Sequence, residues 1–297
     1  GNDAYFNTLS LFYFGTDTTM SVYINNSNLS NIAVASVETV GIRATTVGTF
    51  VLNQVTFDTI VAEDLAAMVL IGGFAVASRP YLRLFEVTMR NSKVGKGFLH
   101  IDGSLASATT ETEMSMLMID CVFQSNFVKF NSGALILIEG FTLNPEVVDV
   151  ESVETKIEGC TFETNSGGLI TSSHTYRDAN RSRFKITNTK FQKNVLKYDG
   201  NIVNSDISLM KMTGEFEMNH CTFSENVGVA DIEDHVAASF DDVELDSAKK
   251  EKISDIAKYN SPLLSISGTV ATLGNNLYEK NIGFSNGVIS CTNKCTM

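Results

Sequence analysis

The stretch CTFETNSGGLI at residues 160–170 contains the pattern that decides the fold. It has a Cys, a Phe two residues later, an Asn three residues after the Phe, and a Gly-Gly pair that leads into an apolar run. The first half of this pattern recurs as CVFQSN at 121–126, TKFQKN at 189–194 and CTFSEN at 221–226, while NLYEKN at 276–281 carries Tyr in place of Phe. We therefore expect the structural repeat to consist of Phe123, Asn126, Phe162, Asn165, Phe191, Asn194, Phe223, Asn226, Tyr278 and Asn281.

Two degenerate copies lie upstream, anchored on Phe57 and on Met89, and the second has its Asn one position early. Between successive anchors, from position 57 to position 278, the intervals are 32, 34, 39, 29, 32 and 55 residues. A repeat whose length varies around thirty residues is typical of a solenoid. In such a fold each turn keeps the same core, and the loops between the strands vary in length.

After each Phe-x-x-Asn we expect a turn and a second short strand, led by Gly or Ser, at 132–140, 166–173, 200–205, 261–268 and 286–291. The repeats have no room for regular amphipathic helices, and parallel strands without crossover helices occur where a sheet coils on itself. The sequence thus predicts an all-β fold, a right-handed parallel β-helix of roughly eight or nine coils over residues 1–290.

Each recurring residue type has a role in such a coil. Successive coils lie about 4.8 Å apart, so equivalent residues stack, and stacked Phe rings fill the interior. An inward Asn can bond backbone groups and the amide of the next coil, which makes an Asn ladder. Gly at the following bend permits a positive φ. In IDCVF we expect Ile119, Cys121 and Phe123 to share the inward face.

Two segments depart from the repeat. Residues 231–259 are acidic early and basic late, and we expect them to be an insertion that includes a short amphipathic helix. Residues 291–297 contain Cys291 and Cys295 and are expected to begin a Cys-containing C-terminal segment.

Composition excludes some classes of function. The net charge of -12 repels phosphate backbones, so nucleic acid is an unsuitable partner. The longest apolar stretch, residues 65–77, is too short to span a bilayer. The five Cys are too few for a disulfide scaffold. Cys121 and Cys160 occupy equivalent positions in consecutive coils, where either a disulfide or two free buried thiols could form, and poor disulfide geometry across parallel strands favours free thiols.

The combination of Phe-x-x-Asn with Gly-Gly-x-Ile, best seen in FETNSGGLI at 162–170, resembles the repeats of the polymorphic outer-membrane proteins of chlamydiae. The resemblance covers roughly residues 50 to 290, and FQSN with the later SGALI is a looser match. It implies a pectin-lyase-like β-helix displayed on the cell surface and used in adhesion. Similar repeats occur in large surface proteins of protists, often beside Cys-rich modules.

Many β-helices act on acidic polysaccharides, so a carbohydrate-active lyase or hydrolase is the alternative function. Hydrolases of this kind need clustered carboxylates. Polygalacturonase-like enzymes carry Asp-Asp, Gly-His-Gly and Arg-x-Lys in that order. Here Asp241-Asp242 follows RFK at 183–185, and Gly-His-Gly is missing. The sequence therefore indicates no catalytic residue, no cofactor and no metal site.

N-glycosylation sequons stand at Asn25, Asn28 and Asn180. We expect an extracellular or cell-surface module, structural or adhesive and non-catalytic, within a larger protein or a filament. The expected partners are other protein subunits or surface glycans, and end-to-end self-association is a further expectation because terminal coils are open sheet edges.

Overall fold

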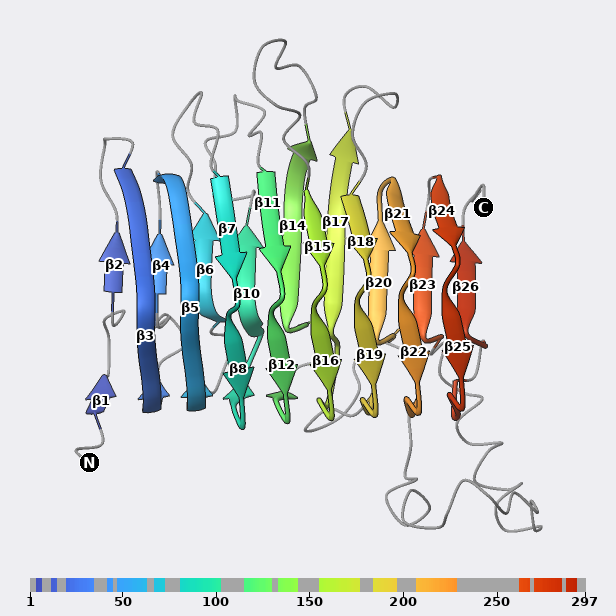
Figure 1. Ribbon diagram of the computed structural model, residues 1–297, viewed down its shortest axis with the longest axis horizontal. Coiled ribbons are helices and arrows are strands. Elements are labelled where there is room, and N and C mark those ends of the chain that lie inside the picture. The colour runs from blue at the N-terminus through green and yellow to red at the C-terminus, as the bar shows by residue number, and fades with distance from the viewer. Residues whose placement is uncertain are drawn as a thin grey trace.

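The computed structural model describes residues 4–6, 12–14, 20–34, 42–44, 47–62, 67–72, 81–102, 115–129, 133–143, 155–176, 184–196, 207–228, 262–267, 270–284 and 287–292. Within these ranges the fold is all-β and contains no helix. The strands form two parallel sheets, one of 17 strands and one of 9, which lie one behind the other along the whole molecule (Figure 1).

The first, larger sheet contains β1 (Ala4–Phe6), β3 (Met20–Val34), β5 (Val47–Ala62), β7 (Tyr81–Phe85), β8 (Thr88–Arg90), β9 (Lys93–Val94), β11 (Ser115–Ile119), β12 (Val122–Gln124), β13 (Phe127–Val128), β15 (Lys156–Glu158), β16 (Thr161–Glu163), β18 (Phe184–Thr187), β19 (Lys190–Gln192), β21 (Phe216–Asn219), β22 (Thr222–Ser224), β24 (Ala271–Gly274) and β25 (Leu277–Glu279). The second sheet contains β2 (Phe12–Phe14), β4 (Ile42–Ala44), β6 (Ala67–Gly72), β10 (Gly97–Asp102), β14 (Ile136–Leu143), β17 (Ile170–Tyr176), β20 (Met210–Thr213), β23 (Leu264–Ser267) and β26 (Ile289–Thr292).

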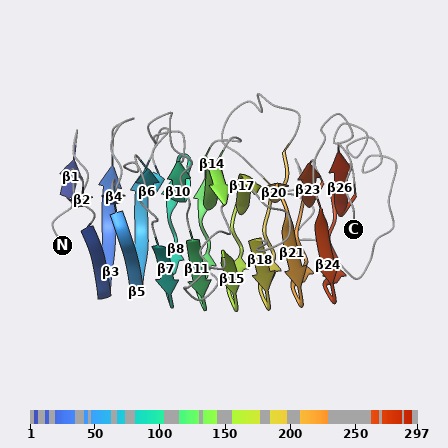
Figure 2. The same cartoon turned by 90° about the horizontal axis from the view of Figure 1, so that it is seen from above.

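The chain alternates between the two sheets. Each visit to the first sheet is followed by one strand of the second, and each new strand pairs in parallel with its counterpart from the previous visit, as β14 does with β10 and β17 does with β14. Figure 2 shows the two rows of strands from above, both running in chain order from the N-terminal to the C-terminal end. Each alternation therefore adds one layer to the molecule.

The core lies between the two sheets. In β18 and β21 the side chains are alternately buried and partly exposed, as strands with one face packed on a core should be. The second sheet contributes consecutive buried residues such as Leu263 and Leu264, or Leu135 and Ile136. These apolar side chains form one continuous cluster through the described layers.

Two corners with left-handed backbone recur in every layer of the first sheet from β3 to β25 and were not predicted. One lies directly before the ladder position, at Asn31, Thr59, Asn91, Ser125, Thr164, Lys193, Glu225 and Lys280, with φ between 51° and 56°. The other lies five residues earlier, at Asn26, Gln54, Glu86, Asp120, Gly159, Asn188, His220 and Asn275, with φ between 49° and 65°. The Gly expected at the bend after the Asn has a positive φ at Gly167, 98°, but the repeated corners are mostly occupied by other residues.

These corners correct one prediction. Ile119 was expected to share the inward face with Cys121 and Phe123, but the structure buries Met118 completely and leaves Ile119 partly exposed on the outer side. Asp120, with φ 53°, turns the chain between them and shifts the alternation by one residue. Side chains therefore alternate between the two faces within each short strand, and this alternation does not continue across the corner.

The expected second strands have mixed outcomes. Strands β14, β17, β23 and β26 overlap the predicted segments. Residues 200–205 lie outside the described residues, and the strand that pairs with β17 is β20, from Met210 to Thr213. The insertion with its helix, 231–259, also lies outside the described residues. At the other predicted boundary, β26 continues to Thr292, so Cys291 is part of the last strand.

Candidate functional site

The aromatic anchors of the repeat form one interior column. Phe123, Phe162, Phe191, Phe223 and Tyr278 are paired in register on successive strands. Their neighbouring ring centroids are 4.8, 5.1, 4.6 and 5.0 Å apart, with interplanar angles of 15° or less. The four Phe side chains are at most 1% exposed. A column packed this closely leaves no space for a ligand, so these residues support the fold.

The layer anchored on Met89 has no ring in this column, and Phe98 of β10 provides one. Phe98 contacts Phe57 and Phe123 edge to face, at centroid distances of 5.0 and 5.6 Å. Met89 itself pairs in register with Phe57 and Phe123. A ring from the second sheet thus fills the volume that a Phe anchor would occupy, and a periodicity search could not detect this.

The Asn residues of the repeat form a hydrogen-bonded ladder beside the aromatic column. In the central rung, the Asn165 backbone N–H and Nδ2 both donate to Asn194 Oδ1 at 3.0 Å, and Nδ2 also donates to the Phe123 carbonyl at 2.8 Å. The same set of bonds links Asn126 to Asn165, Asn194 to Asn226 and Asn226 to Asn281. Every donor and acceptor of the buried amides is satisfied in these rungs, as burial requires.

The ladder begins at Ser92. Its Oγ accepts from the Ile60 backbone N–H at 3.0 Å, while its own backbone N–H donates to Asn126 Oδ1 at 3.2 Å. Asn91, the Asn of the degenerate copy, instead lies on the surface and donates to Asp58. The ladder position is therefore the third residue after the anchor, and a residue with a hydroxyl group can occupy it.

The repeat cysteines occupy a second interior column. Cys121, Cys160 and Cys221 are free and buried, as favoured from the sequence. The Cys121 N–H donates to Cys160 Sγ at 3.4 Å, and Cys221 N–H donates to Asn276 Oδ1 at 2.8 Å. A side-chain hydrogen bond with Cys121 and burial raise the pKa of Cys160, against the opposing effect of the Cys121 backbone N–H, and burial raises the pKa of Cys221 to about 11. Such thiols are poor nucleophiles and fit a structural role.

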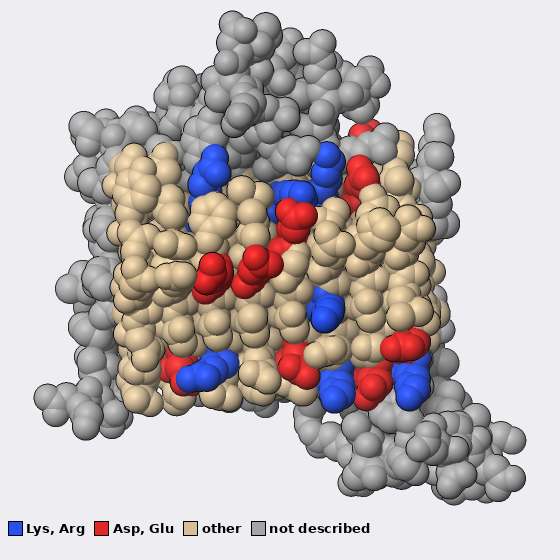
Figure 3. Space-filling view, viewed as in Figure 1, with Lys and Arg blue, Asp and Glu red and all other residues tan. Residues whose placement is uncertain are grey.

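The outer face of the first sheet carries the residues that differ between repeats. Figure 3 shows this face as largely uncharged, with Lys, Arg, Asp and Glu interspersed. One register row contains Thr56, Thr88, Val122, Thr161, Lys190, Thr222 and Leu277. The acidic net charge is therefore not concentrated into one field on this face, where charges of both signs lie among uncharged side chains.

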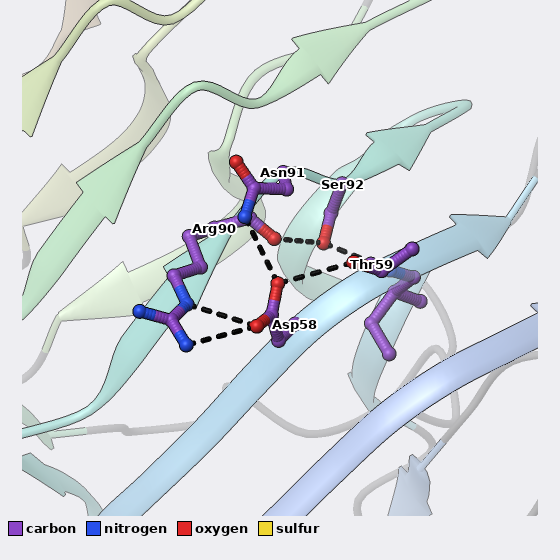
Figure 4. Close-up of polar contacts among 6 residues, drawn as sticks. Asp58, Thr59, Arg90, Asn91 and Ser92 are labelled. Carbon is purple, nitrogen blue, oxygen red and sulfur yellow. Dashed lines mark hydrogen bonds and ion pairs between the residues drawn. The ribbon is translucent and has the colours of Figure 1, made fainter. Parts of the chain in front are cut away.

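A polar cluster centred on Asp58 lies on this surface near the start of the ladder (Figure 4). The carboxylate accepts hydrogen bonds from Arg90 Nε at 3.0 Å, Asn91 Nδ2 at 3.0 Å and Thr59 Oγ1 at 3.1 Å. The Asn91 bond, with those from Arg90 and Thr59, holds the pKa of Asp58 below its ordinary value against the opposing effect of desolvation. The hydrogen bonds that Arg90 and Asn91 donate to the Asp58 carboxylate connect β5 with β8 and the residue that follows it.

The second sheet contains a His–carboxylate pair. Nε2 of His100, which is 4% exposed, lies 2.8 Å from Glu139 Oε2, and Lys96 Nζ lies 3.8 Å from the same oxygen. The bond with His100, ahead of the charge of Lys96, lowers the pKa of Glu139 despite its burial. The pair connects β10 with β14. Its geometry suits proton transfer, but a His buried this deeply offers little access to a substrate.

The remaining candidates are distributed as follows. Asn25 and Asn28 are exposed on β3, as attachment of a glycan requires, and Asn180 lies outside the described residues. Cys291 is disulfide-bonded, while Cys295 lies outside the described residues. The described part of the chain has no group of three or more His, Cys, Asp or Glu arranged to hold a metal ion. It also has no helix long and apolar enough to cross a membrane.

No protein-family model, no curated protein and no solved structure matches the chain. We therefore infer function from the residues and their geometry.

Proposed function

We propose that the chain is a right-handed parallel β-helix in which each alternation between the two sheets is one coil. The in-register parallel pairing, the stacked rings and the Asn ladder support this closure. Parallel crossover connections are right-handed in nearly all known cases, which supports the handedness. With one strand of the second sheet per coil, nine strands at about 4.8 Å give a rod roughly 40 Å long.

We further propose that this rod is a non-catalytic structural or adhesive module, at the cell surface or outside the cell, within a larger protein or filament. The observation that carries the proposal is the filled interior. The Phe, Asn and Cys side chains of the repeat are used for packing or for hydrogen bonds inside the molecule, so recognition is left to the outward side chains. Surface glycans or other protein subunits are the partner classes that such a mixed, largely neutral face suits.

Two measurements test this function. Antibodies against the chain should label intact, unpermeabilised cells, and labelling that requires permeabilisation would contradict the proposed location. Binding to glycan and protein arrays should be lost when Thr88, Thr161 and Thr222 are together changed to Glu. The free energy of unfolding should change little, because these side chains lie on the outer face. Binding that survives this triple change would place the partner elsewhere.

A carbohydrate-active enzyme is the second candidate, and the His100–Glu139 pair is the observation that favours it. Acidic polysaccharides should be screened for lyase and hydrolase products with and without Ca²⁺. Product formation by the wild type that Glu139→Gln abolishes would support the enzyme and contradict the non-catalytic proposal.

A further inference from the structure

Among the described strands, β24 and β25 form the C-terminal edge of the first sheet. Strand β24 pairs with β21 and β25 pairs with β22, and neither has a second neighbour among the described strands (Figure 1). The inward side chains of this layer, Leu273 and Tyr278, are only partly buried against the core, whereas the equivalent Met218 and Phe223 one layer earlier are at most 1% exposed. This edge therefore leaves apolar surface that another layer would cover.

The direction of hydrogen-bond donation along the ladder determines which side chain the next layer must contain. Each rung donates forward through its backbone N–H and Nδ2 to the Oδ1 of the next Asn. Asn281 accepts from Asn226 and donates backward from Nδ2 to the Phe223 carbonyl at 2.9 Å. Among the described residues nothing accepts its backbone N–H or the second Nδ2 proton. The edge therefore presents two N–H donors of Asn281, and one side-chain oxygen can accept from both.

The described N-terminal layers of a second copy do not supply that oxygen. Their residues at the ladder position are Ala4 and Ile32, which pair with each other in register. Ile32 is in turn paired with Ile60. Stacking the N-terminal end of one copy on the C-terminal end of another would bury both Asn281 donors against hydrocarbon, which is costly. The expected end-to-end self-association is therefore disfavoured at this edge.

We propose that this edge binds a polypeptide segment that carries its own Phe-x-x-Asn pattern and adds as a parallel strand beyond β24 and β25. The incoming Asn Oδ1 would accept from both Asn281 donors, its Nδ2 would donate to the Tyr278 carbonyl, and its Phe would stack on the Tyr278 ring. Strand addition of this kind takes its affinity from main-chain hydrogen bonds and its specificity from alternate side chains. The inference rests on the β-helix of the proposed function but not on its adhesive role.

A peptide with the sequence of residues 184–196, FKITNTKFQKNVL, is the probe, and the same peptide with Asn194→Leu is its control. The two peptides have equal charge, so attraction to the acidic chain is matched. We expect the parent peptide to bind the full chain about tenfold more tightly or better, because the control leaves the Asn281 donors unpaired. Hydrogen exchange should slow at the Lys280 and Asn281 amides, since their counterparts Glu225 and Asn226 donate forward one layer earlier.

Two variants of the chain locate the binding. Leu273→Glu places a charge on the inward face of the edge and should abolish binding of the parent peptide. Leu277→Glu adds the same charge on the outer face, where Leu277 is 50% exposed, and should leave binding unchanged. Both variants should retain the thermal unfolding of the wild type within a few degrees, and if Leu273→Glu unfolds, Leu273→Ser replaces it.

Several outcomes would overturn the inference. These are equal affinity of the two peptides, no binding of either, or equal effects of the two Glu variants. Sedimentation that shows the chain assembling without peptide into species that the parent peptide does not dissociate would favour a second copy as the occupant. A failed peptide experiment with an intact β-helix refutes only this inference, whereas loss of the β-helix itself would refute the proposed fold.

Discussion

Asn194 Oδ1 accepts two hydrogen bonds from Asn165, one from the backbone N–H and one from Nδ2, each 3.0 Å long. The pair joins two layers through main chain and side chain at once, and Asn194 is 0% exposed. A residue that lacks the oxygen cannot replace it without leaving buried donors unpaired.

Asn194→Leu should therefore destabilise the protein by about 3 kcal/mol, because two donors of Asn165 and the Phe162 carbonyl each lose a partner. Urea unfolding followed by circular dichroism measures this. Gln192→Leu, two residues earlier on the outer side of β19, is the control and should change stability by less than about 0.5 kcal/mol. Similar effects of the two changes would contradict the ladder.

Tyr278→Phe should stabilise the protein by about 1 kcal/mol, since the Tyr278 hydroxyl is buried and has no hydrogen-bond partner among the described residues. Burial also raises the pKa of this phenol to about 12. The substitution makes the fifth ring of the column match the other four. Tyr23→Phe is the control, because Tyr23 is 61% exposed and should be neutral. A loss of stability in Tyr278→Phe would mean that the hydroxyl has a partner.

The order of the anchors was readable from the sequence because Phe and Asn recur at one fixed spacing. The roles of Ser92 and Phe98 could not be predicted from the sequence. Ser92 takes the ladder position with a hydroxyl in place of an amide, and Phe98 reaches the aromatic column from the second sheet. The corner at Asp120 was also missed, because left-handed backbone is uncommon for residues other than Gly, and the enrichment of Asn, Asp and His there is a weak signal in a chain rich in Asn. Residues that could bind a partner on the outer face are not marked by the Phe-x-x-Asn repeat, so its periodicity could not identify them.

Lys193→Gly should stabilise the protein, by up to about 1 kcal/mol, because Lys193 is exposed and holds φ at 55°. Lys190→Gly is the matched control. Lys190 is also an exposed Lys, but it lies within β19, and Gly there should cost about 0.5–1 kcal/mol. Midpoints of thermal unfolding compare the two. If both changes destabilise the protein equally, the corner at Lys193 carries no strain.

Asp58→Asn should reduce the acid sensitivity of the fold. The folded-state pKa of Asp58 lies below its ordinary value of 3.8, so the ionised carboxylate adds stability above the unfolded pKa. This contribution is lost as the pH falls through the folded pKa. Urea midpoints measured at several pH values between 7 and 2 should fall less steeply below about pH 4 in the variant. Identical profiles would show that the cluster in Figure 4 does not couple to folding.

Cys121, Cys160 and Cys221 should resist alkylation in the folded protein, because all three are buried away from the reagent and the pKa values of Cys160 and Cys221 are raised. Treatment with iodoacetamide at pH 8, followed by peptide mapping, should show little modification at these positions in buffer and complete modification in urea. Rapid labelling of any of the three in the native state would show that the interior column opens to solvent.

A crystal structure of the chain would show directly whether each layer is a closed coil. We expect the connections between the two sheets to close every layer into a right-handed coil. We also expect Phe123, Phe162, Phe191 and Phe223 to stack inside, beside an Asn165–Asn194 hydrogen bond near 3.0 Å. Two sheets joined without closed coils, or Phe and Asn side chains turned to solvent, would contradict it.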